Sequence, residues 1–119
     1  MTKRILVVED ESLLALDIAD QLRDAGFEVV GPATSVARAQ QLIREVGCDA
    51  AVLDVNLGHE TVEPVAHALQ LSGVPFLFLS GNSREQLSPG FHSAPWLSKP
   101  VIPALLLAAV RERVLGKGS

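Results

Sequence analysis

Polar side chains suited to metal or phosphoryl chemistry follow four apolar runs of the chain. Glu9 and Asp10 come directly after one run, Asp54 ends another, Ser80 ends a third, and Lys99 follows a weaker fourth. Carboxylates that gather in one place repel each other, so they must be partly protonated or share a cation. A hard cation is the better solution at neutral pH, and Mg²⁺ suits a site with a few carboxylates, waters and a phosphate oxygen.

The same residues suit the transfer of a phosphoryl group to a carboxylate. Asp54 is a poor nucleophile toward phosphorus unless charge on the incoming group is neutralised. A divalent cation on one side and the Lys99 ammonium group on the other can do this. The Ser80 hydroxyl can then donate to a phosphoryl oxygen.

Short apolar runs that alternate with segments of helical period must position these residues. This alternation is typical of an α/β protein with a mainly parallel sheet. The runs lack polar alternation, which indicates that helices cover both sheet faces. Functional groups collect at the carboxyl ends of such strands, so Glu9, Asp10 and Asp54 should share one crevice. The runs are residues 5–8, 28–30, 50–53, 76–79 and 96–97.

Apolar residues at helical spacing predict three helices between these runs. Gly26, Gly47 and Gly73 stand just past the three helices, where a left-handed residue commonly ends a helix. The predicted buried stripes are Leu14/Ile18/Leu22, Ala39/Leu42/Ile43/Val46 and Val62/Val65/Ala66/Leu69.

The last third of the chain predicts one further helix and one irregular element. A helix from Pro103 to about Leu115 is expected because proline is tolerated in a first helical turn. Residues 104–110 are apolar all the way round such a helix, so we expect this helix to carry a partner-binding or dimerising face. Residues 81–91 stand where a fourth helix belongs, but they carry little apolar periodicity and are interrupted by Pro89. We expect a short or irregular element there.

At these residues the sequence resembles the receiver domain of two-component response regulators, over essentially the whole chain. The resemblance rests on four pieces in order: the acidic residues in VVEDE, Asp54 in VLDVNL, Ser80-Gly81, and Lys99-Pro100. It implies a doubly wound, flavodoxin-like α/β fold with a five-stranded parallel sheet of order 2-1-3-4-5. It also implies a single receiver domain over residues 1–119.

The resemblance assigns roles to individual positions. The residue matching Asp54 accepts phosphate from a histidine kinase or phosphotransfer protein. The positions of Glu9 and Asp10 and the backbone carbonyl of Asn56 help to hold Mg²⁺ together with Asp54. The chain would then be a signalling module in a phosphorelay that assists its own Mg²⁺-dependent phosphorylation and dephosphorylation, and not an enzyme acting on a separate substrate.

Ser80 and Lys99 match the family's switch hydroxyl and phosphate-contacting lysine. Three positions depart from the family pattern. Glu9 replaces the usual aspartate, which adds a methylene to a metal contact. Trp96 stands where a Tyr or Phe usually swings inward on phosphorylation. Asn82 replaces an often aromatic residue, which puts the usual switch coupling in doubt.

Further segments resemble an alphaproteobacterial subset of receivers that is associated with HWE-family or related histidine kinases. These segments are residues 30–33, 64–66 and 76–81.

Composition excludes several other classes of protein. Apolar residues make up 48% of the 119 residues and charged residues 20%, which argues against disorder. Ten Lys and Arg against 14 acids argue against electrostatic nucleic-acid binding. Cys48 is the sole cysteine, which excludes an intramolecular disulfide and fits a reducing compartment such as the cytoplasm. The longest apolar stretch, residues 101–110, is half a membrane span, so no membrane association is expected.

Two alternatives stay open at this point. Glu9 and Trp96 make a receiver-like interaction module that does not accept phosphate conceivable. The order Asp54-Val55-Asn56 superficially resembles the nucleophile motif of haloacid dehalogenases, which suggests a small aspartyl-phosphate phosphatase. That family places its nucleophile after the first strand, whereas Asp54 follows the third predicted strand.

Overall fold

The central element of the fold is a parallel sheet whose strands coincide with the apolar runs of the sequence. The computed structural model describes residues 2–81 and 87–115. Its five-stranded sheet has the order β2-β1-β3-β6-β7, and every neighbouring pair is parallel. This confirms the predicted doubly wound α/β fold and its strand order. The strands are β1 (Arg4–Val8), β2 (Glu28–Ala33), β3 (Ala50–Asp54), β6 (Phe76–Ser80) and β7 (Trp96–Ser98).

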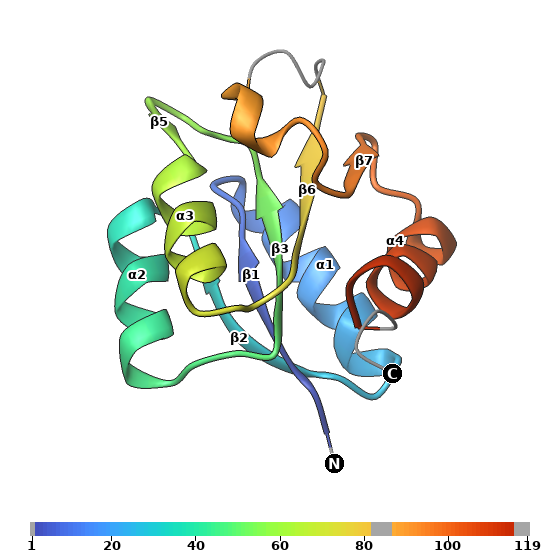
Figure 1. Cartoon of the computed structure of the whole chain (residues 1–119). Helices are drawn as coiled ribbons and strands as arrows, with labels where there is room; N and C mark the ends of the chain where they lie inside the picture. The colour runs from blue at the N-terminus through green and yellow to red at the C-terminus, as the bar shows by residue number, and fades with distance from the viewer. Residues whose placement is uncertain (1, 82–86, 116–119) are drawn as a thin grey trace.

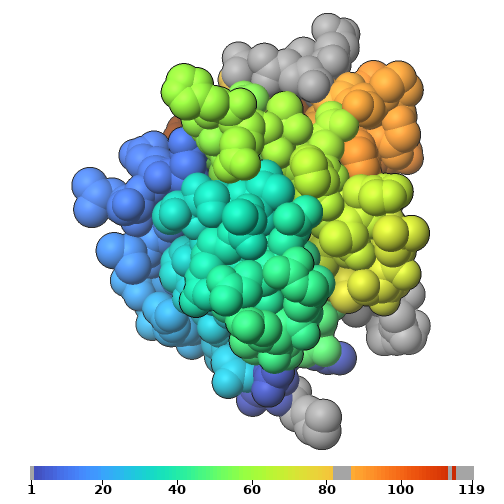
Figure 2. Space-filling model, turned by 90° about the vertical axis from the view of Figure 1, so that its left-hand side faces the viewer, coloured from blue at the N-terminus to red at the C-terminus, as the bar shows by residue number. Residues whose placement is uncertain are grey.

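Helices cover both faces of this sheet (Figure 1). The three predicted helices are α1 (Ser12–Asp24), α2 (Val36–Glu45) and α3 (Glu63–Leu71). The fourth helix, α4 (Pro103–Ala109), continues into a π-helical segment (Val110–Leu115). α2 and α3 pack on one face, which Figure 2 shows from outside, and α1 and α4 pack on the other.

Two apolar clusters form the core, one on each face of the sheet. All five residues of β3 and all five of β6 are buried, as expected for strands covered on both sides. Ile18 and Leu22 of α1 pack with Leu106 of α4 in one cluster. Val65 and Leu69 of α3 belong to the other cluster.

The helix ends agree with the sequence expectations in all but one detail. Gly26, Gly47 and Gly73 have positive φ angles of 96°, 79° and 72°, which confirms the predicted helix stops. The assignment of Val46 to the buried stripe of α2 was wrong. α2 ends at Glu45, and Val46 is 46% exposed because the chain has already left the helix there.

Between β6 and β7 the described residues contain no α-helix, which agrees with the short or irregular element predicted there. Its described part contains one 3₁₀ turn (Pro89–Phe91), in which Phe91 is buried. The Phe91 ring packs edge-to-face against Phe76 and Phe78, with centroids 6.3 and 5.8 Å away. The remainder of the predicted irregular element, residues 82–86, lies outside the described residues.

A small hairpin between β3 and α3 was not predicted. It pairs β4 (Asn56–Leu57) antiparallel to β5 (Glu60–Thr61). Among the described helices, none has the length and hydrophobicity needed to cross a membrane.

Candidate functional site

The sheet register brings the predicted site residues to one edge of the molecule. Val8 pairs with Leu53, so the residues that follow β1 lie beside the end of β3. Asp54 pairs with Leu79. Ser80 pairs with Ser98, the residue before Lys99. The arrowheads of β3 and β6 in Figure 1 point to this edge.

Backbone hydrogen bonds fix the chain at the strand ends. The Glu9 N–H donates to the Ala33 carbonyl at the end of β2, at 3.0 Å. The Val55 N–H donates to the Leu79 carbonyl at 3.0 Å. The Lys99 N–H donates to the Ser80 carbonyl at 2.9 Å, which holds this lysine beside the end of β6. The side chains of the site therefore project from regular, well-anchored backbone.

Three carboxylates meet at this edge. One oxygen each from Glu9, Asp10 and Asp54 lies within 4.8 Å of the others. Glu9 and Asp54 are buried, with exposed fractions of 0% and 4%, while Asp10 is exposed. Such a set of hard oxygen donors, open to solvent on one side, matches the preference of Mg²⁺ for a few carboxylates and several waters.

Lys99 balances part of this negative charge. Its Nζ lies 3.0 Å from Glu9 Oε1 and 3.1 Å from Asp54 Oδ2. Partial burial lowers the pKa of Lys99, but the bonds to Glu9 and Asp54 outweigh burial, so its pKa lies above the ordinary value. Lys99 therefore stays a cation at neutral pH and contacts the same oxygens that a phosphoryl group would approach.

Glu9 carries the strongest electrostatic perturbation of the site. Burial and the neighbouring Asp54 carboxyl raise the pKa of Glu9 to about 7, against the opposing effects of the Glu11 N–H and Lys99. Within the described residues, Glu9 Oε1 has no aligned hydrogen bond, although Lys99 stands beside it. A buried oxygen in this situation is suited to a cation, so the donor set fits Mg²⁺.

The other predicted site residues lie around the carboxylates. Ser80 is buried at the end of β6 and Asn56 is exposed in β4, paired with Thr61. Trp96 is half-buried at the start of β7, paired with Phe78. Trp96 therefore lies back from the edge that carries Ser80, on an outer strand of the sheet.

One residue beside the site was not singled out from the sequence. Gly58 forms the turn of the β4–β5 hairpin with a φ of +67°, and a Cβ on it would lie 3.6 Å from Asp10 Oδ2. A glycine between two short strand segments is the hairpin signal that would have located it.

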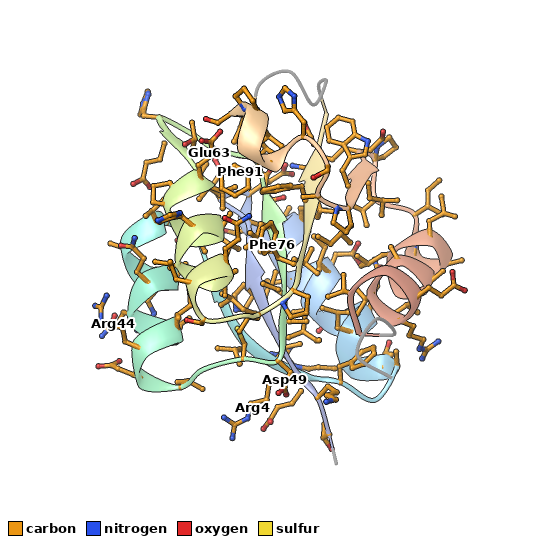
Figure 3. All side chains as sticks on the ribbon, in the orientation of Figure 1. Arg4, Arg44, Asp49, Glu63, Phe76 and Phe91 are labelled. Carbon is orange, nitrogen blue, oxygen red and sulfur yellow. The ribbon has the colours of Figure 1, made fainter. Side chains whose placement is uncertain are left out.

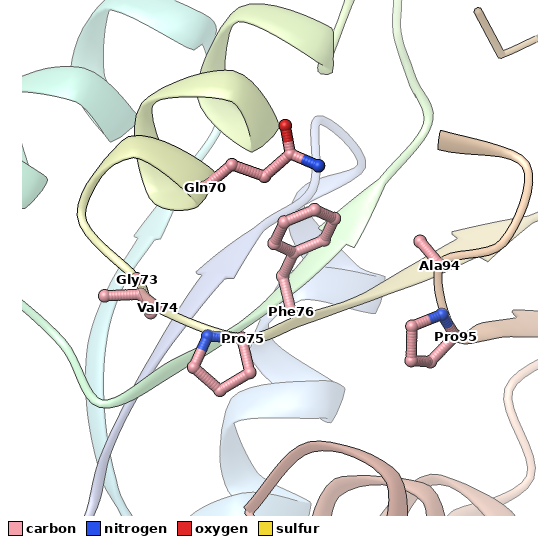
Figure 4. Close-up of a pocket in the computed structure, with 7 residues that line it drawn as sticks. All are labelled: Gln70, Gly73, Val74, Pro75, Phe76, Ala94 and Pro95. Atoms are coloured by element: carbon pink, nitrogen blue, oxygen red, sulfur yellow. The ribbon is translucent and has the colours of Figure 1, made fainter. Parts of the chain in front are cut away.

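An apolar hollow on the surface lies elsewhere. It has a volume of about 320 Å³ and is found at the start of β6, the end opposite Ser80 (Figure 4). It therefore does not belong to the carboxylate site. Its lining residues are Gln70, Gly73, Val74, Pro75, Phe76, Ala94 and Pro95.

Comparison with known proteins identifies relatives in sequence and in structure. No protein-family model matches the chain. The chain is 38% identical to the solution structure of SdrG from Sphingomonas melonis Fr1, with a TM-score of 0.79, over 92% of this chain and 93% of SdrG. A structure of the BeF₃-activated conformation of SdrG is 40% identical, with a TM-score of 0.75 over 90% of this chain and 94% of that one.

Two curated regulators match over nearly the whole chain. The transcriptional regulatory protein PdtaR of Mycobacterium tuberculosis is 29% identical over 93% of this chain and 58% of PdtaR. The DNA-binding response regulator MtrA of the same species is 33% identical over 96% of this chain and 51% of MtrA. The chain thus spans little more than half the length of either regulator. Sequence, fold and strand order agree: the chain belongs to the receiver-domain family of two-component response regulators, and it resembles the alphaproteobacterial receivers.

Proposed function

We propose that this receiver accepts a phosphoryl group on Asp54 from a histidine kinase or phosphotransfer protein and thereby switches the binding of a partner. The observation that carries this proposal is the position of Lys99 Nζ, 3.1 Å from Asp54 Oδ2 within a cluster of three carboxylates. An acceptor carboxylate with a fixed cation beside it and a second cation site next to it is suited to take up a dianionic phosphoryl group.

The transfer requires one bond to form and one to break. An Asp54 oxygen forms the new bond to phosphorus, while the bond between phosphorus and the donor imidazole nitrogen breaks and the imidazole takes up a proton from water. Lys99 neutralises charge on the phosphoryl oxygens, and the Ser80 hydroxyl is placed at the same sheet edge to donate to one of them.

Glu9, Asp10, Asp54 and the Asn56 carbonyl would hold Mg²⁺. The ion would supply further positive charge at the phosphoryl oxygens when bound. The exposed position of Asp10 leaves room for waters in its coordination shell. Water is the acceptor when Asp54 later loses its phosphoryl group. The same ion and Lys99 would assist both reactions, so the chain assists its own phosphorylation and dephosphorylation.

We place the output surface at α4 and the segment before it. Ile102 and Leu105 are each 51% exposed, and they line a hollow of about 460 Å³ together with Trp96 and Lys99. Lys99 contacts Asp54 and also lines this hollow. A phosphoryl group on Asp54 would therefore change the charge next to this apolar surface. A second copy of the chain, paired through α4, is the partner we favour.

We further propose that residues 1–119 form one receiver domain that works in the cytoplasm. A histidine kinase of the HWE type is the donor that the alphaproteobacterial resemblance favours. Direct binding of nucleic acid or of a membrane is not part of the proposed function.

Phosphorylation by acetyl phosphate tests the function. Intact-mass measurement with Mg²⁺ should show one added phosphoryl group on the unsubstituted protein and none on Asp54→Asn. Asp20→Asn is the matched control, since Asp20 is exposed on α1 and pairs only weakly with Arg23 at 3.5 Å. Labelling that persists in EDTA, or in Asp54→Asn, would contradict the proposal.

The same preparation separates the alternatives. Absence of labelling in the unsubstituted protein would favour an interaction module that does not accept phosphate. In such a module, the contact of Lys99 with Glu9 would compete with its contact with Asp54. Steady release of phosphate from a phosphomonoester would favour a small phosphatase.

A further inference from the structure

A pair of short hydrogen bonds joins α3 to the irregular connection between β6 and β7. The Glu63 carboxylate accepts the Ser88 backbone N–H at 2.7 Å and the Ser88 hydroxyl at 2.6 Å. Charge-assisted bonds of this length are about twice as strong as neutral ones. Figure 3 shows Glu63 near Phe91, the buried aromatic residue of the same connection.

On one side, this pair is anchored next to the phosphoacceptor. Glu63 is the first residue of α3. The residue before it, Val62, donates its N–H to the Val55 carbonyl at 3.1 Å. Val55 directly follows Asp54 and is itself bonded to Leu79. A displacement of the backbone after Asp54 is therefore passed to Val62 by this hydrogen bond and to Glu63 by the next peptide bond.

On the other side, the pair leads to Trp96. The Ser88 carbonyl accepts the Phe91 N–H at 2.9 Å, and the Phe91 carbonyl accepts the Ala94 N–H at 3.1 Å. Pro95, the next residue, accepts the Phe78 N–H at 3.0 Å and precedes Trp96. Residues 88–95 thus form a hydrogen-bonded unit that is packed on the sheet and ends at the tryptophan.

The placement of Glu63 shows that its carboxylate is committed to this contact. A glutamate in the first turn of a helix commonly interacts with the free N–H groups of its own helix. α3 has no side-chain capping bond from Val62, and both Glu63 oxygens are instead turned to Ser88, 25 positions along the chain. Since Ser88 is exposed and Glu63 is half-buried, the hydrophobic core does not require the pair.

We propose that the Glu63–Ser88 pair links the two loops at the site, so that phosphorylation of Asp54 moves residues 88–95 and changes the surroundings of Trp96. This inference rests on the proposed function and specifies how the site is coupled to the rest of the molecule. Glu63 is a positioning residue: it acts through Ser88 and does not touch the phosphoryl group. Without the pair, the loop after Asp54 and residues 88–95 move independently.

Beryllofluoride with Mg²⁺, which imitates a phosphoryl group on an aspartate, provides the test. Fluorine NMR measures its binding, and the emission of Trp96, the sole tryptophan, measures the response. Glu63→Ala should retain the fluorine signal of bound beryllofluoride but lose at least about half of the emission change, because residues that carry coupling change it about twofold or more. Ser88→Ala should lose less, because its N–H still donates to Glu63.

Three further variants separate coupling from a general structural effect. Glu60→Ala is the matched control, since the Glu60 carboxylate accepts the Val36 N–H at the start of α2. It should respond like the unsubstituted protein. The double variant Glu63→Ala/Ser88→Ala should respond like Glu63→Ala alone, because both changes break the same link. Ser88→Thr, which keeps the hydroxyl, should restore the response relative to Ser88→Ala.

Each outcome of the experiment decides the inference. The inference would be overturned if Glu63→Ala binds beryllofluoride and shows an unchanged emission response. It would also be overturned if the unsubstituted protein binds beryllofluoride without any emission change. If the unsubstituted protein does not bind beryllofluoride, this would instead contradict the proposed function itself. Thermal unfolding of each variant shows that it is folded at the temperature of the measurement.

Discussion

The ammonium group of Lys99 lies 3.1 Å from Asp54 Oδ2, and the same nitrogen lies 3.0 Å from Glu9 Oε1. One cation is thus shared by two buried carboxylates. Removing it leaves two buried charges in one place without compensation, which costs free energy and also removes the charge that would meet a phosphoryl group.

Lys99→Ala should therefore affect stability and phosphorylation together. We expect the free energy of unfolding to fall by about 1–3 kcal/mol in the absence of a divalent cation. The initial rate of labelling by acetyl phosphate should fall by at least about tenfold. Urea denaturation and intact mass measure the two effects. Lys3→Ala removes an exposed lysine and is the control. A labelling rate equal to that of Lys3→Ala would show that Lys99 does not act on the phosphoryl group.

Asp10 and Glu11 are adjacent acids with different positions relative to the site. Asp10 belongs to the carboxylate cluster, whereas Glu11 precedes α1 and contributes only its N–H, which donates to Glu9 Oε2 at 3.1 Å. Asp10→Ala should weaken Mg²⁺ binding by about tenfold or more, and Glu11→Ala should leave it nearly unchanged. Calorimetric titration with Mg²⁺ measures both affinities. Equal affinities in the two variants would exclude Asp10 as a ligand.

The sheet and the residues at its edge could be predicted from the sequence because both depend on local patterns. Uninterrupted apolar runs identify buried parallel strands, and the residue after such a run must lie at the carboxyl edge. Asp54 and Lys99 are located in this way without knowledge of any contact between them. The strand order, which the family resemblance supplied, brings both residues to the same edge with only β6 between their strands, and the Lys99 side chain reaches Asp54 Oδ2 at 3.1 Å.

Features that depend on contacts between distant segments could not be predicted in this way. Val46 continues the apolar period of α2, but the helix has already ended at Glu45. The two bonds between Glu63 and Ser88 join segments with no shared pattern, and each residue alone is an ordinary polar surface residue. Tertiary geometry decides such cases, since helical period and residue type do not specify which loops meet.

Cys48 offers a pH-dependent property outside the site. Burial, and to a lesser extent the charge of Asp49, raise the pKa of this thiol to about 11 from 9.0. Alkylation by iodoacetamide at pH 8 should therefore be at least about tenfold slower in the folded protein than in urea, because the thiolate is the reactive form. Asp49→Asn should increase the rate. Equal rates in the folded and unfolded protein would contradict the raised pKa.

The raised pKa of Cys48 also makes the free energy of unfolding depend on pH, and its direction fixes the sign of this dependence. The folded state favours the protonated thiol, so its contribution to stability is complete below about pH 9 and is lost as the pH rises toward 11. Cys48→Ala removes this contribution. The loss of unfolding free energy between pH 8.5 and about 10.5 should thus be smaller in Cys48→Ala than in the unsubstituted protein, as measured by urea denaturation.

Leu105 and Leu106 are neighbours on α4 with opposite environments. Leu106 is fully buried in the cluster that contains Ile18 and Leu22, while Leu105 is 51% exposed beside Ile102. Leu106→Ala should lower the free energy of unfolding by about 2–5 kcal/mol, the usual cost of a large-to-small change in a core. Leu105→Ser should change it by less than about 0.5 kcal/mol.

The same two variants test the output surface. An exposed apolar patch is a site for association, so Leu105→Ser should weaken any self-association that beryllofluoride and Mg²⁺ induce. Sedimentation velocity of the unsubstituted protein and of Leu105→Ser, each with and without beryllofluoride, measures this. The expected result is a dimer in the activated unsubstituted protein only. If that protein sediments as a monomer in both states, or if Leu105→Ser dimerises equally well, α4 does not pair two copies of the chain.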